Sequence, residues 1–470
     1  MRTLIKNGTI LTAENEFMAD ILIKDQIIEE IGRNIVCNAD NIIDAEGMYV
    51  FPGGVDQHTH FDALCNVGNQ DTAGYETTKA TIVGGTTTII DYAPQYEGKN
   101  LIESIDFRRE NRAKGRACVD YAFHSLVTEA SDIIFDDLRR LPEIGVSSIK
   151  VFMAYKGSPL YADDGVLYRV LREAKDVGVT VFVHTENADL IDMMQKEEIK
   201  KGNTAPKYHA VSRPPLVEYE AAQRAIIIAQ SIDSPMFIAH VSCKEVVDRI
   251  RNARREGARI FGETCTQYLV LTEDKLDGPT FEKSIKYICS PALRPQHQLD
   301  AMWESIQNGW LDVVASDHCG ISIKGMKDYG KDKNFAVIPN GAPGSADRLA
   351  MLWTMGVATG KLSKKRFVDV FATKAAKFNG IYPRKGTIAV GSDADIVVFD
   401  PNLRGAISNE TNPNGVDYNI YEGMETIGAP KKIFLRGNLV VDDGKFVGKL
   451  GQGEFIWSDA FAEAYQNRKD

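Results

Sequence analysis

The sequence predicts an α/β fold in which a (β/α)8 TIM-type barrel carries a small β-sandwich domain built from both chain termini. In the middle of the chain, eight short apolar segments alternate with helical stretches of about 10–15 residues, the pattern of a parallel sheet. Strand-like segments with turn signals occupy both ends. The 470 residues suffice for a barrel, which needs about 250, and a further domain.

The two ends of the chain predict one shared β domain. Near the start, Asn7-Gly8 reads as a hairpin signal and Lys24-Asp25 as a second turn. Strand character returns in 391–400 and 431–448. We expect a β domain of residues 1–52 and 380–450, a catalytic barrel of 53–379, and a C-terminal tail of 451–470 that packs on its own barrel or at a subunit interface.

The barrel strands are expected where short apolar runs are bounded by turn residues. The helices between them include two that precede Gly178 and Gly257, each predicted as a C-cap. The eight expected strands are 54–61, 86–93, 118–127, 148–155, 180–187, 235–242, 259–268 and 311–319. Because barrel enzymes place their active sites at the carboxyl ends of the strands, polar residues there are the candidates for function.

Composition and charge narrow the class of protein. A hydrophobic content of 44% with 26% charged residues is typical of a folded protein. The net charge of −10 argues against nucleic acid and anionic membrane as partners. Three further features favour a cytoplasmic enzyme. The cysteines are scattered without a C-x-x-C pair, no apolar run approaches ~18 residues, and the sequence shows no signal-peptide core.

Histidine and carboxylate side chains end several of the expected strands. His58 and His60 form an H-x-H pair, and the alternation of side chains along a strand puts both on one face. His184, His240 and Asp317 end the fifth, sixth and eighth strands. Imidazole and carboxylate suit Zn²⁺, with Mn²⁺ or Co²⁺ as alternatives. The five residues together predict a metal site.

Lys150 lies inside an otherwise apolar strand, where a buried ammonium ion is costly. Three interpretations are open: a lysine that snorkels to solvent, a Schiff-base lysine, and a lysine carboxylated by CO₂. A carbamate would carry one negative charge and two oxygens, enough to bridge two metals. The neighbouring histidines favour this third interpretation.

The remaining candidates receive structural interpretations. His124, His209 and His297 are expected to be structural or surface residues. His318 follows Asp317, so alternation turns it away from the metal. Cys65 and Cys319 lie near expected active-site loops, but no arrangement suggests a nucleophile.

The sequence resembles the hydantoinase/dihydropyrimidinase family of the cyclic amidohydrolases over essentially its whole length. The H-x-H and Asp motifs belong to the wider amidohydrolase superfamily, whereas KVFMAYKG, CSPALR and PNGAPG are narrower and separate this family from dihydroorotases. The likeness weakens in 64–78 and 320–335, which we expect to shape the pocket for the ring substituent. The segments that carry it are FPGGVDQHTHF, GGTTTIIDYA, SIKVFMAYKG, VHTEN, the His240 strand, ETCTQYL, ICSPALR, ASDHC, IPNGAPG and GSDADIVVFD.

The resemblance implies a complete catalytic site. It implies two Zn²⁺ per subunit, bridged by a hydroxide and by Lys150 modified to N6-carboxylysine. Tyr155 would polarise the amide oxygen, Asp317 would shuttle the proton, and the main chain at Ser290 and Asn340 would hold the ring. The implied metal ligands are His58, His60 and Asp317 on one ion, His184 and His240 on the other, and Lys150 on both.

The implied reaction is hydrolytic ring opening of 5-substituted hydantoins or dihydropyrimidines to N-carbamoyl amino acids. The expected partner is a small cyclic ureide or imide, with a homotetramer as the assembly. Allantoin hydrolysis, a non-catalytic assembly protein of the same family and a Schiff-base lyase are the alternatives. All six ligand positions are present, which argues against the non-catalytic alternative.

Overall fold

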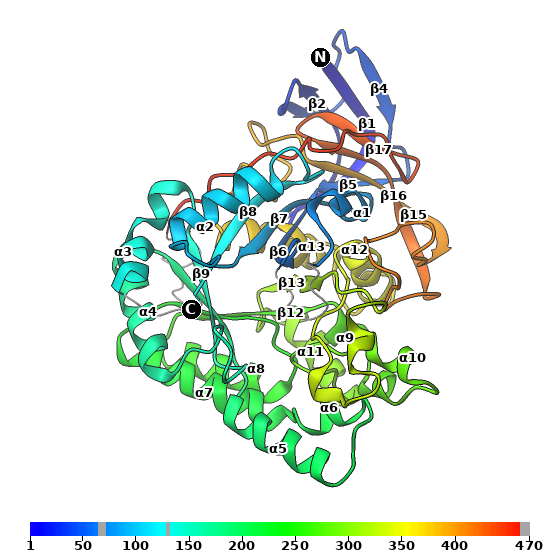
Figure 1. The fold of residues 1–470 in the computed structure, drawn as a ribbon. Helices are drawn as coiled ribbons and strands as arrows, with labels where there is room; N and C mark the ends of the chain where they lie inside the picture. Colours follow the sequence, from blue (N-terminus) through cyan, green and yellow to red (C-terminus); the bar gives the residue numbers. More distant parts are fainter. Residues whose placement is uncertain (64–71, 128–131, 461–470) are drawn as a thin grey trace.

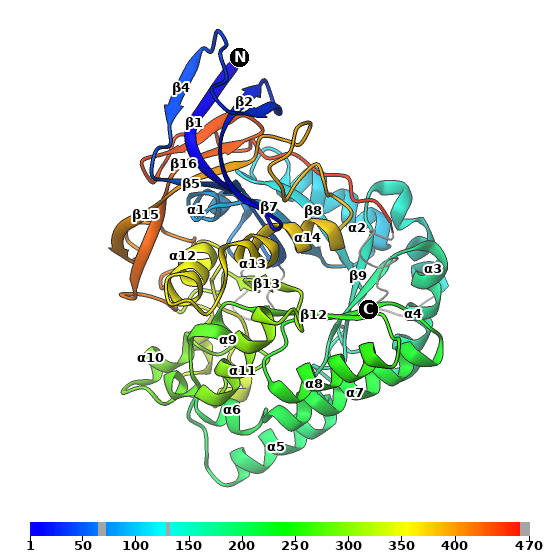
Figure 2. The same ribbon diagram turned by 180° about the vertical axis from the view of Figure 1, so that it is seen from behind.

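The structure is a computed structural model that describes residues 1–63, 72–127 and 132–460 (Figure 1). It contains a mixed sheet built from both ends of the chain and a parallel sheet in the middle, each of nine strands. Helices surround the parallel sheet on its outer side, as the two opposite views show (Figures 1 and 2). The predicted fold class is confirmed.

The terminal sheet joins the two ends of the chain through antiparallel pairing of β5 with β15. Its hydrogen-bonded order is β18-β17-β16-β15-β5-β1-β2-β3, with β4 beside β1. Ile5, Ile21 and Phe434 are among the apolar side chains that pack together on one face. The strands are β1 (Arg2–Leu11), β2 (Glu16–Lys24), β3 (Ile27–Gly32), β4 (Asn41–Asp44), β5 (Tyr49–Pro52), β15 (Ile396–Ala406), β16 (Glu425–Leu435), β17 (Asn438–Asp442) and β18 (Lys445–Phe446).

The hairpin predicted at Asn7-Gly8 is wrong. Strand β1 runs through both residues, and its register with β2 shifts between Ile5 and Gly8, which is a β-bulge. A Cβ atom at Gly8 would lie 2.6 Å from Val50 Cγ2, so close packing against β5 requires the glycine. The second turn is confirmed, since β2 and β3 are antiparallel partners joined through Asp25, which has a φ of 53°.

The parallel sheet closes into the barrel through its eighth expected strand, which the structure splits in two. The split places β13 against β12 and β14 against β6, with Ser316 and Asp317 between the halves. The strands are β6 (Gly54–His60), β7 (Thr86–Ala93), β8 (Asp120–Leu126), β9 (Ser148–Phe152), β10 (Thr180–His184), β11 (Met236–Ile238), β12 (Ile260–Cys265), β13 (Val313–Ala315) and β14 (His318–Cys319).

Several barrel strands end earlier than the sequence predicts. Tyr155, His240 and Asp317 lie just beyond their strands and have φ values of 64°, 38° and 50°. Non-glycine residues rarely adopt this left-handed conformation, which turns the chain out of the strand direction. The predicted site residues therefore come from the bends after the strands as well as from the strands themselves.

One of the two predicted glycine C-caps, Gly178, is confirmed. Asp163 caps α4 through the backbone N–H of Val166, and Gly178 ends it in the left-handed conformation. Helix α8 ends at Arg255 and its C-cap is Glu256, so the C-cap predicted at Gly257 is one residue too late. The helices are α1 (Thr78–Val83), α2 (Leu101–Arg108), α3 (Asp132–Arg140), α4 (Asp164–Val177), α5 (Ala188–Lys200), α6 (Tyr208–Val211), α7 (Pro215–Ser231), α8 (Lys244–Arg255), α9 (Gln267–Val270), α10 (Phe281–Ile285), α11 (Gln296–Gln307), α12 (Arg348–Leu352), α13 (Lys364–Val368) and α14 (Lys374–Phe378).

The C-terminal tail, as far as residue 460, packs on its own barrel. Phe455 bridges to Tyr121 of β8, its ring lies 5.8 Å from that of Phe123, and Ile456 is buried. Residues 461–470, the rest of the expected tail, lie outside the described residues, and so do residues 64–71 with Cys65.

Candidate metal centre

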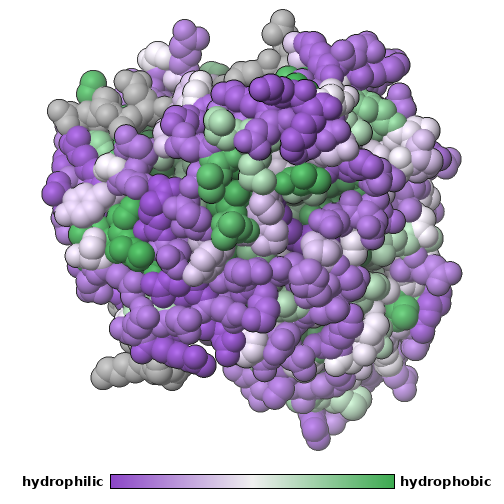
Figure 3. All heavy atoms as spheres, turned by 90° about the horizontal axis from the view of Figure 1, so that it is seen from below, coloured by the Kyte–Doolittle hydropathy of each residue, from purple (hydrophilic) through white to green (hydrophobic). Residues whose placement is uncertain are grey.

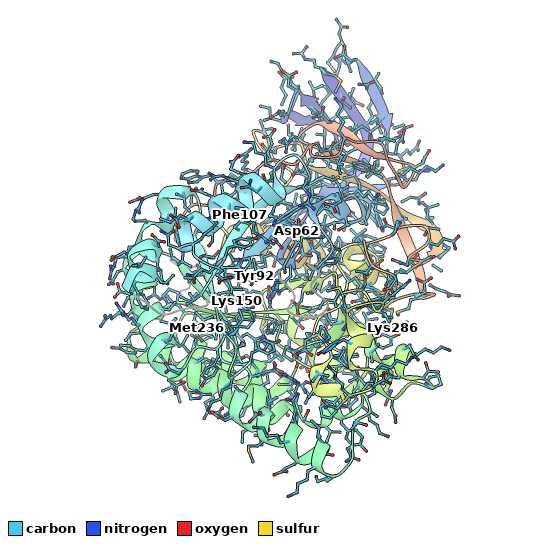
Figure 4. All side chains as sticks on the ribbon, in the orientation of Figure 1. Asp62, Tyr92, Phe107, Lys150, Met236 and Lys286 are labelled. Carbon is cyan, nitrogen blue, oxygen red and sulfur yellow. The ribbon has the colours of Figure 1, made fainter. Side chains whose placement is uncertain are left out.

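A cavity of about 1100 Å³ opens at the carboxyl end of the barrel. Lys150 is fully buried beside it, next to Tyr92 at the centre of the barrel (Figure 4). The structure thus brings the predicted site residues together. Those that line the cavity are His58, His60, Tyr155, His184, His240, Ser290, Asp317 and Asn340.

His58, His60 and Asp317 form the first potential ligand set. Asp317 Oδ1 lies 3.2 Å from His58 Nε2 and 3.3 Å from His60 Nε2. The three ligand atoms lie within 4.8 Å of one another, close enough to hold one divalent ion. Burial opposes the charge of Asp317, but the neighbouring histidines outweigh it and lower the pKa of this carboxyl.

His184 and His240 form a second set across the cavity. Their ring centroids are 4.4 Å apart, and that of His240 is 5.2 Å from His58. Glu186 Oε2 lies 2.8 Å from His184 Nε2, which leaves Nδ1 as the ring nitrogen available to a ligand. Burial lowers the pKa of both imidazoles and keeps them neutral, the state that a metal ligand requires.

The environment of Lys150 contradicts the interpretation that it snorkels to solvent. Its side chain has no exposed surface, and its Nζ lies 3.4 Å from His58 Nε2 and 4.8 Å from the Tyr92 ring centroid. Within the described part of the chain, no carboxylate forms an ion pair with it. Burial lowers the pKa of Lys150 to about 8, although the nearby Glu263 charge opposes this.

Two buried glutamates that the sequence did not predict contact two of the candidate ligand histidines. Glu263 on β12 contacts His58 Nδ1 and accepts a hydrogen bond of 2.7 Å from Gln57 Nε2. Glu186 pairs with Arg213 at 2.7 Å in addition to His184. Such partners fix which ring nitrogen faces a metal. Glu263 could have been found in the same way as Lys150, because each is a charged residue inside an otherwise apolar strand.

The structure confirms the interpretation of the other histidines. His124 is buried between Ser148 Oγ and the Gln57 carbonyl, at 2.5 and 2.8 Å. His209 lies 2.8 Å from the Cys289 carbonyl, and His297 is exposed. The His318 ring turns away from the cluster, stacks on Phe61 and accepts a hydrogen bond from the backbone N–H of Gly344.

The rest of the cavity could hold a small ring and its substituent. Burial raises the pKa of Tyr155 to about 12, so its hydroxyl stays a hydrogen-bond donor. Ser290 is buried at the cavity wall. One wall carries apolar side chains such as Leu126 and Phe152, and the segment 94–100 forms another wall. Cys319 and, within the divergent segment 320–335, Ile321 also line the cavity.

Comparison with known proteins assigns this chain to a family. Residues 49–440 match the Amidohydrolase family. The chain is 44% identical to a D-hydantoinase of Geobacillus stearothermophilus over 97% of its own length and 96% of the relative's. This chain belongs to the hydantoinase/dihydropyrimidinase family of cyclic amidohydrolases.

Other members of the family are similar over the same extent. A dihydropyrimidinase of Rattus norvegicus is 37% identical, covering 99% of this chain and 91% of the relative. The crystal structure of a dihydropyrimidinase from Brevibacillus agri has a TM-score of 0.95 and 42% identity, covering 98% of this chain and 100% of that one. The likeness therefore includes the terminal sheet as well as the barrel.

Proposed function

We propose that this family member is a binuclear zinc amidohydrolase that opens the ring of 5-substituted hydantoins, dihydropyrimidines or both, and releases N-carbamoyl amino acids. The observation that carries the proposal is the convergence of four histidines, Asp317 and Lys150 at one end of the barrel. The names of the relatives, D-hydantoinase and dihydropyrimidinase, support the substrate class.

The residues fit two zinc ions. His58, His60 and Asp317 would hold one ion, and His184 and His240 the other. The imidazoles of His58, His184 and His240 are buried and neutral. Glu263 and Glu186 orient His58 and His184. Carboxylation would turn Lys150 from an uncompensated buried cation into an anionic bridge. Bound metal ions would polarise the amide oxygen and lower the pKa of an attacking water.

The side chains of the cavity would then perform the proton and charge transfers. Asp317 would accept a proton from the attacking water and deliver it to the ring nitrogen as the carbon–nitrogen bond breaks. The protonated Tyr155 hydroxyl would donate to the amide oxygen as it becomes negative. The main chain at Ser290 and Asn340 would hold the amide edges of the ring.

A zinc assay combined with a ring-opening screen tests this proposal. We expect two zinc ions per subunit and ring opening of hydantoin, 5-phenylhydantoin or dihydrouracil. Activity on allantoin alone would support the allantoinase alternative. Absence of zinc and of ring opening would support the non-catalytic alternative, and borohydride trapping of substrate on Lys150 would identify a Schiff-base lyase.

We also propose a cytoplasmic homotetramer, on the family resemblance and the scattered cysteines. In the described residues, no helix is both long and apolar enough to cross a bilayer. The face seen from below in Figure 3 is largely hydrophilic, with separate apolar patches. Light scattering checks the assembly, and a species of only 52 kDa would contradict it.

A further inference from the structure

The strand that carries His58 and His60 is held from behind by a buried aspartate. Thr59 lies between the two histidines and points to the opposite side of β6. Its Oγ1 donates to Asp91 Oδ1 on β7 at 2.7 Å, and the backbone N–H of Phe61 donates to the same oxygen at 3.1 Å. Asp91 is fully buried. This carboxylate therefore fixes the backbone on either side of His60.

Arg108, the last residue of α2, completes this arrangement. Its Nη2 pairs with Asp91 Oδ2 at 2.6 Å and also donates to the Phe61 carbonyl. Its Nε donates to the Tyr75 hydroxyl at 3.0 Å, and that hydroxyl donates to Asp91 Oδ2 at 2.5 Å. The guanidinium has no exposed surface. The ion pair is thus embedded in a network that satisfies it, as a buried pair requires.

The same guanidinium reaches the wall of the cavity. Arg108 Nη1 donates to the Tyr96 hydroxyl at 3.0 Å and to the Asp62 carbonyl at 3.3 Å. Tyr96 belongs to the segment 94–100 that lines the cavity. One side chain therefore connects the end of the H-x-H strand to a wall of the proposed substrate pocket.

A third connection runs through Tyr92, the chain neighbour of Asp91. Tyr92 faces the barrel interior beside Lys150, whereas Phe107, the neighbour of Arg108, belongs to the covering helix α2 (Figure 4). The Tyr92 ring lies 4.7 Å from the His58 ring and 4.9 Å from the His60 ring. Anchoring Asp91 thus also holds the ring on which both histidines pack.

We propose that Asp91 and Arg108 form a positioning unit that sets the first metal site and the 94–100 wall together. Neither side chain lines the cavity, so the unit acts through Thr59, Phe61, Tyr92 and Tyr96. The planar fork of arginine makes these contacts in fixed directions, which a lysine cannot reproduce. The expected effect of this unit on kcat/KM rests on the proposed ring-opening function, whereas its expected effect on metal affinity does not.

Arg108→Lys tests the whole unit. We expect zinc affinity in a chelator competition and kcat/KM for ring opening each to fall by about 10–100-fold, the usual cost of losing a residue that orients metal ligands. Arg366→Lys is the control, because Arg366 also donates to two carbonyls, those of Ile306 and Leu311, and pairs with Asp369 outside the cavity. Its zinc affinity and kcat/KM should stay within about twofold of wild type.

Two hydroxyl deletions separate the connections and remain usable if Arg108→Lys does not fold. Tyr96→Phe removes the contact to the wall, so we expect a several-fold rise in KM with unchanged kcat and zinc content, the pattern of lost substrate binding. Tyr75→Phe removes the hydroxyl between Arg108 and Asp91, so we expect weaker zinc binding.

The results distinguish this proposal from a purely structural role. Variants that lose thermal stability but keep wild-type zinc affinity, kcat and KM would overturn it. A wild-type protein that opens none of the rings would refute the proposed function, and the zinc affinities of the variants would still decide whether the unit positions the metal site.

Discussion

The two ends of the barrel bury charged groups in opposite ways. At the amino end of β8, Lys385 Nζ lies 2.6 Å from Asp120, 3.0 Å from Asp393 and 2.8 Å from Asp395. Arg436 also contacts Asp120. The cations and carboxylates there neutralise one another and tie the barrel to the terminal sheet, because Asp120 and Lys385 come from regions far apart in the chain.

At the carboxyl end of the barrel, the buried charges are not all paired with opposite charges. Lys150 is as buried as Lys385, yet within the described residues its Nζ has an imidazole nitrogen as its neighbour in place of a carboxylate. His240 Nδ1 and Glu186 Oε1 are buried without hydrogen-bond partners in the same part of the structure. The cations at the amino end are paired with carboxylates, whereas the carboxyl end is suited to receive further charge from a ligand.

Replacing Lys150 should produce the largest effect. If the carboxylated lysine bridges two metals, Lys150→Ala removes the shared ligand, so we expect the loss of at least one zinc per subunit and of nearly all ring opening. Metal analysis and intact-mass measurement check this prediction. Lys385→Met is the matched control, since it removes an equally buried lysine and should keep both zinc ions.

Three outcomes would change the interpretation of Lys150. Normal zinc content in Lys150→Ala with lost activity would favour the Schiff base. Partial recovery of the variant with acetate and Zn²⁺ would strengthen the bridging role. A wild-type protein with two zinc ions, full activity and an unmodified Lys150 would exclude the carbamate.

Lys385→Met should destabilise the amino end of the barrel, where the buried charges are paired. It leaves three buried carboxylates with too little positive charge, so we expect a loss of about 3–5 kcal/mol in the free energy of unfolding. Denaturant unfolding measures this loss. Ring opening per folded molecule should stay at the wild-type level, and a specific loss of turnover would show that the two ends are not independent.

Tyr155→Phe tests the role of one hydroxyl group at the carboxyl end of the barrel. Loss of one donor to a developing oxyanion costs about 10²–10³ in kcat, and we expect an effect of this size with normal zinc content. Steady-state kinetics on the best substrate from the screen provides the measurement. A change in KM alone would make Tyr155 a substrate-binding residue.

The smallest expected effect is that of Asp347, a buried carboxyl group that has no cation as an ion-pair partner among the described residues. Asp347 accepts a hydrogen bond from Asn419 Nδ2 at 2.8 Å, and burial raises its pKa to about 7. The folded state therefore holds this proton more tightly than the unfolded state, and stability should decline as the pH rises from about 4 to about 7. Asp347→Asn should remove this part of the decline, a difference of a few degrees in thermal midpoint across the range. Equal pH slopes in both proteins would contradict the prediction.

Local sequence patterns by themselves determined the fold class and most of the candidate site. Apolar runs and capping residues predict the strands and helices because burial and backbone hydrogen bonding act over a few residues. Alternation along one strand places His58 and His60 together. Lys150 stands out because a charge within an apolar strand conflicts with its surroundings.

Tertiary structure alone decided the features that depend on distant partners. The bulge at Gly8 follows from its packing on Val50, and Asp317 takes its position from the split that closes the barrel. Glu263 reaches His58 from a strand about two hundred positions away, and Arg108 connects Phe61 after β6 with Asp91 and Tyr96 in and after β7. Hydrogen bonds and steric contacts act only between neighbours in space, and only the closed barrel makes these residues neighbours.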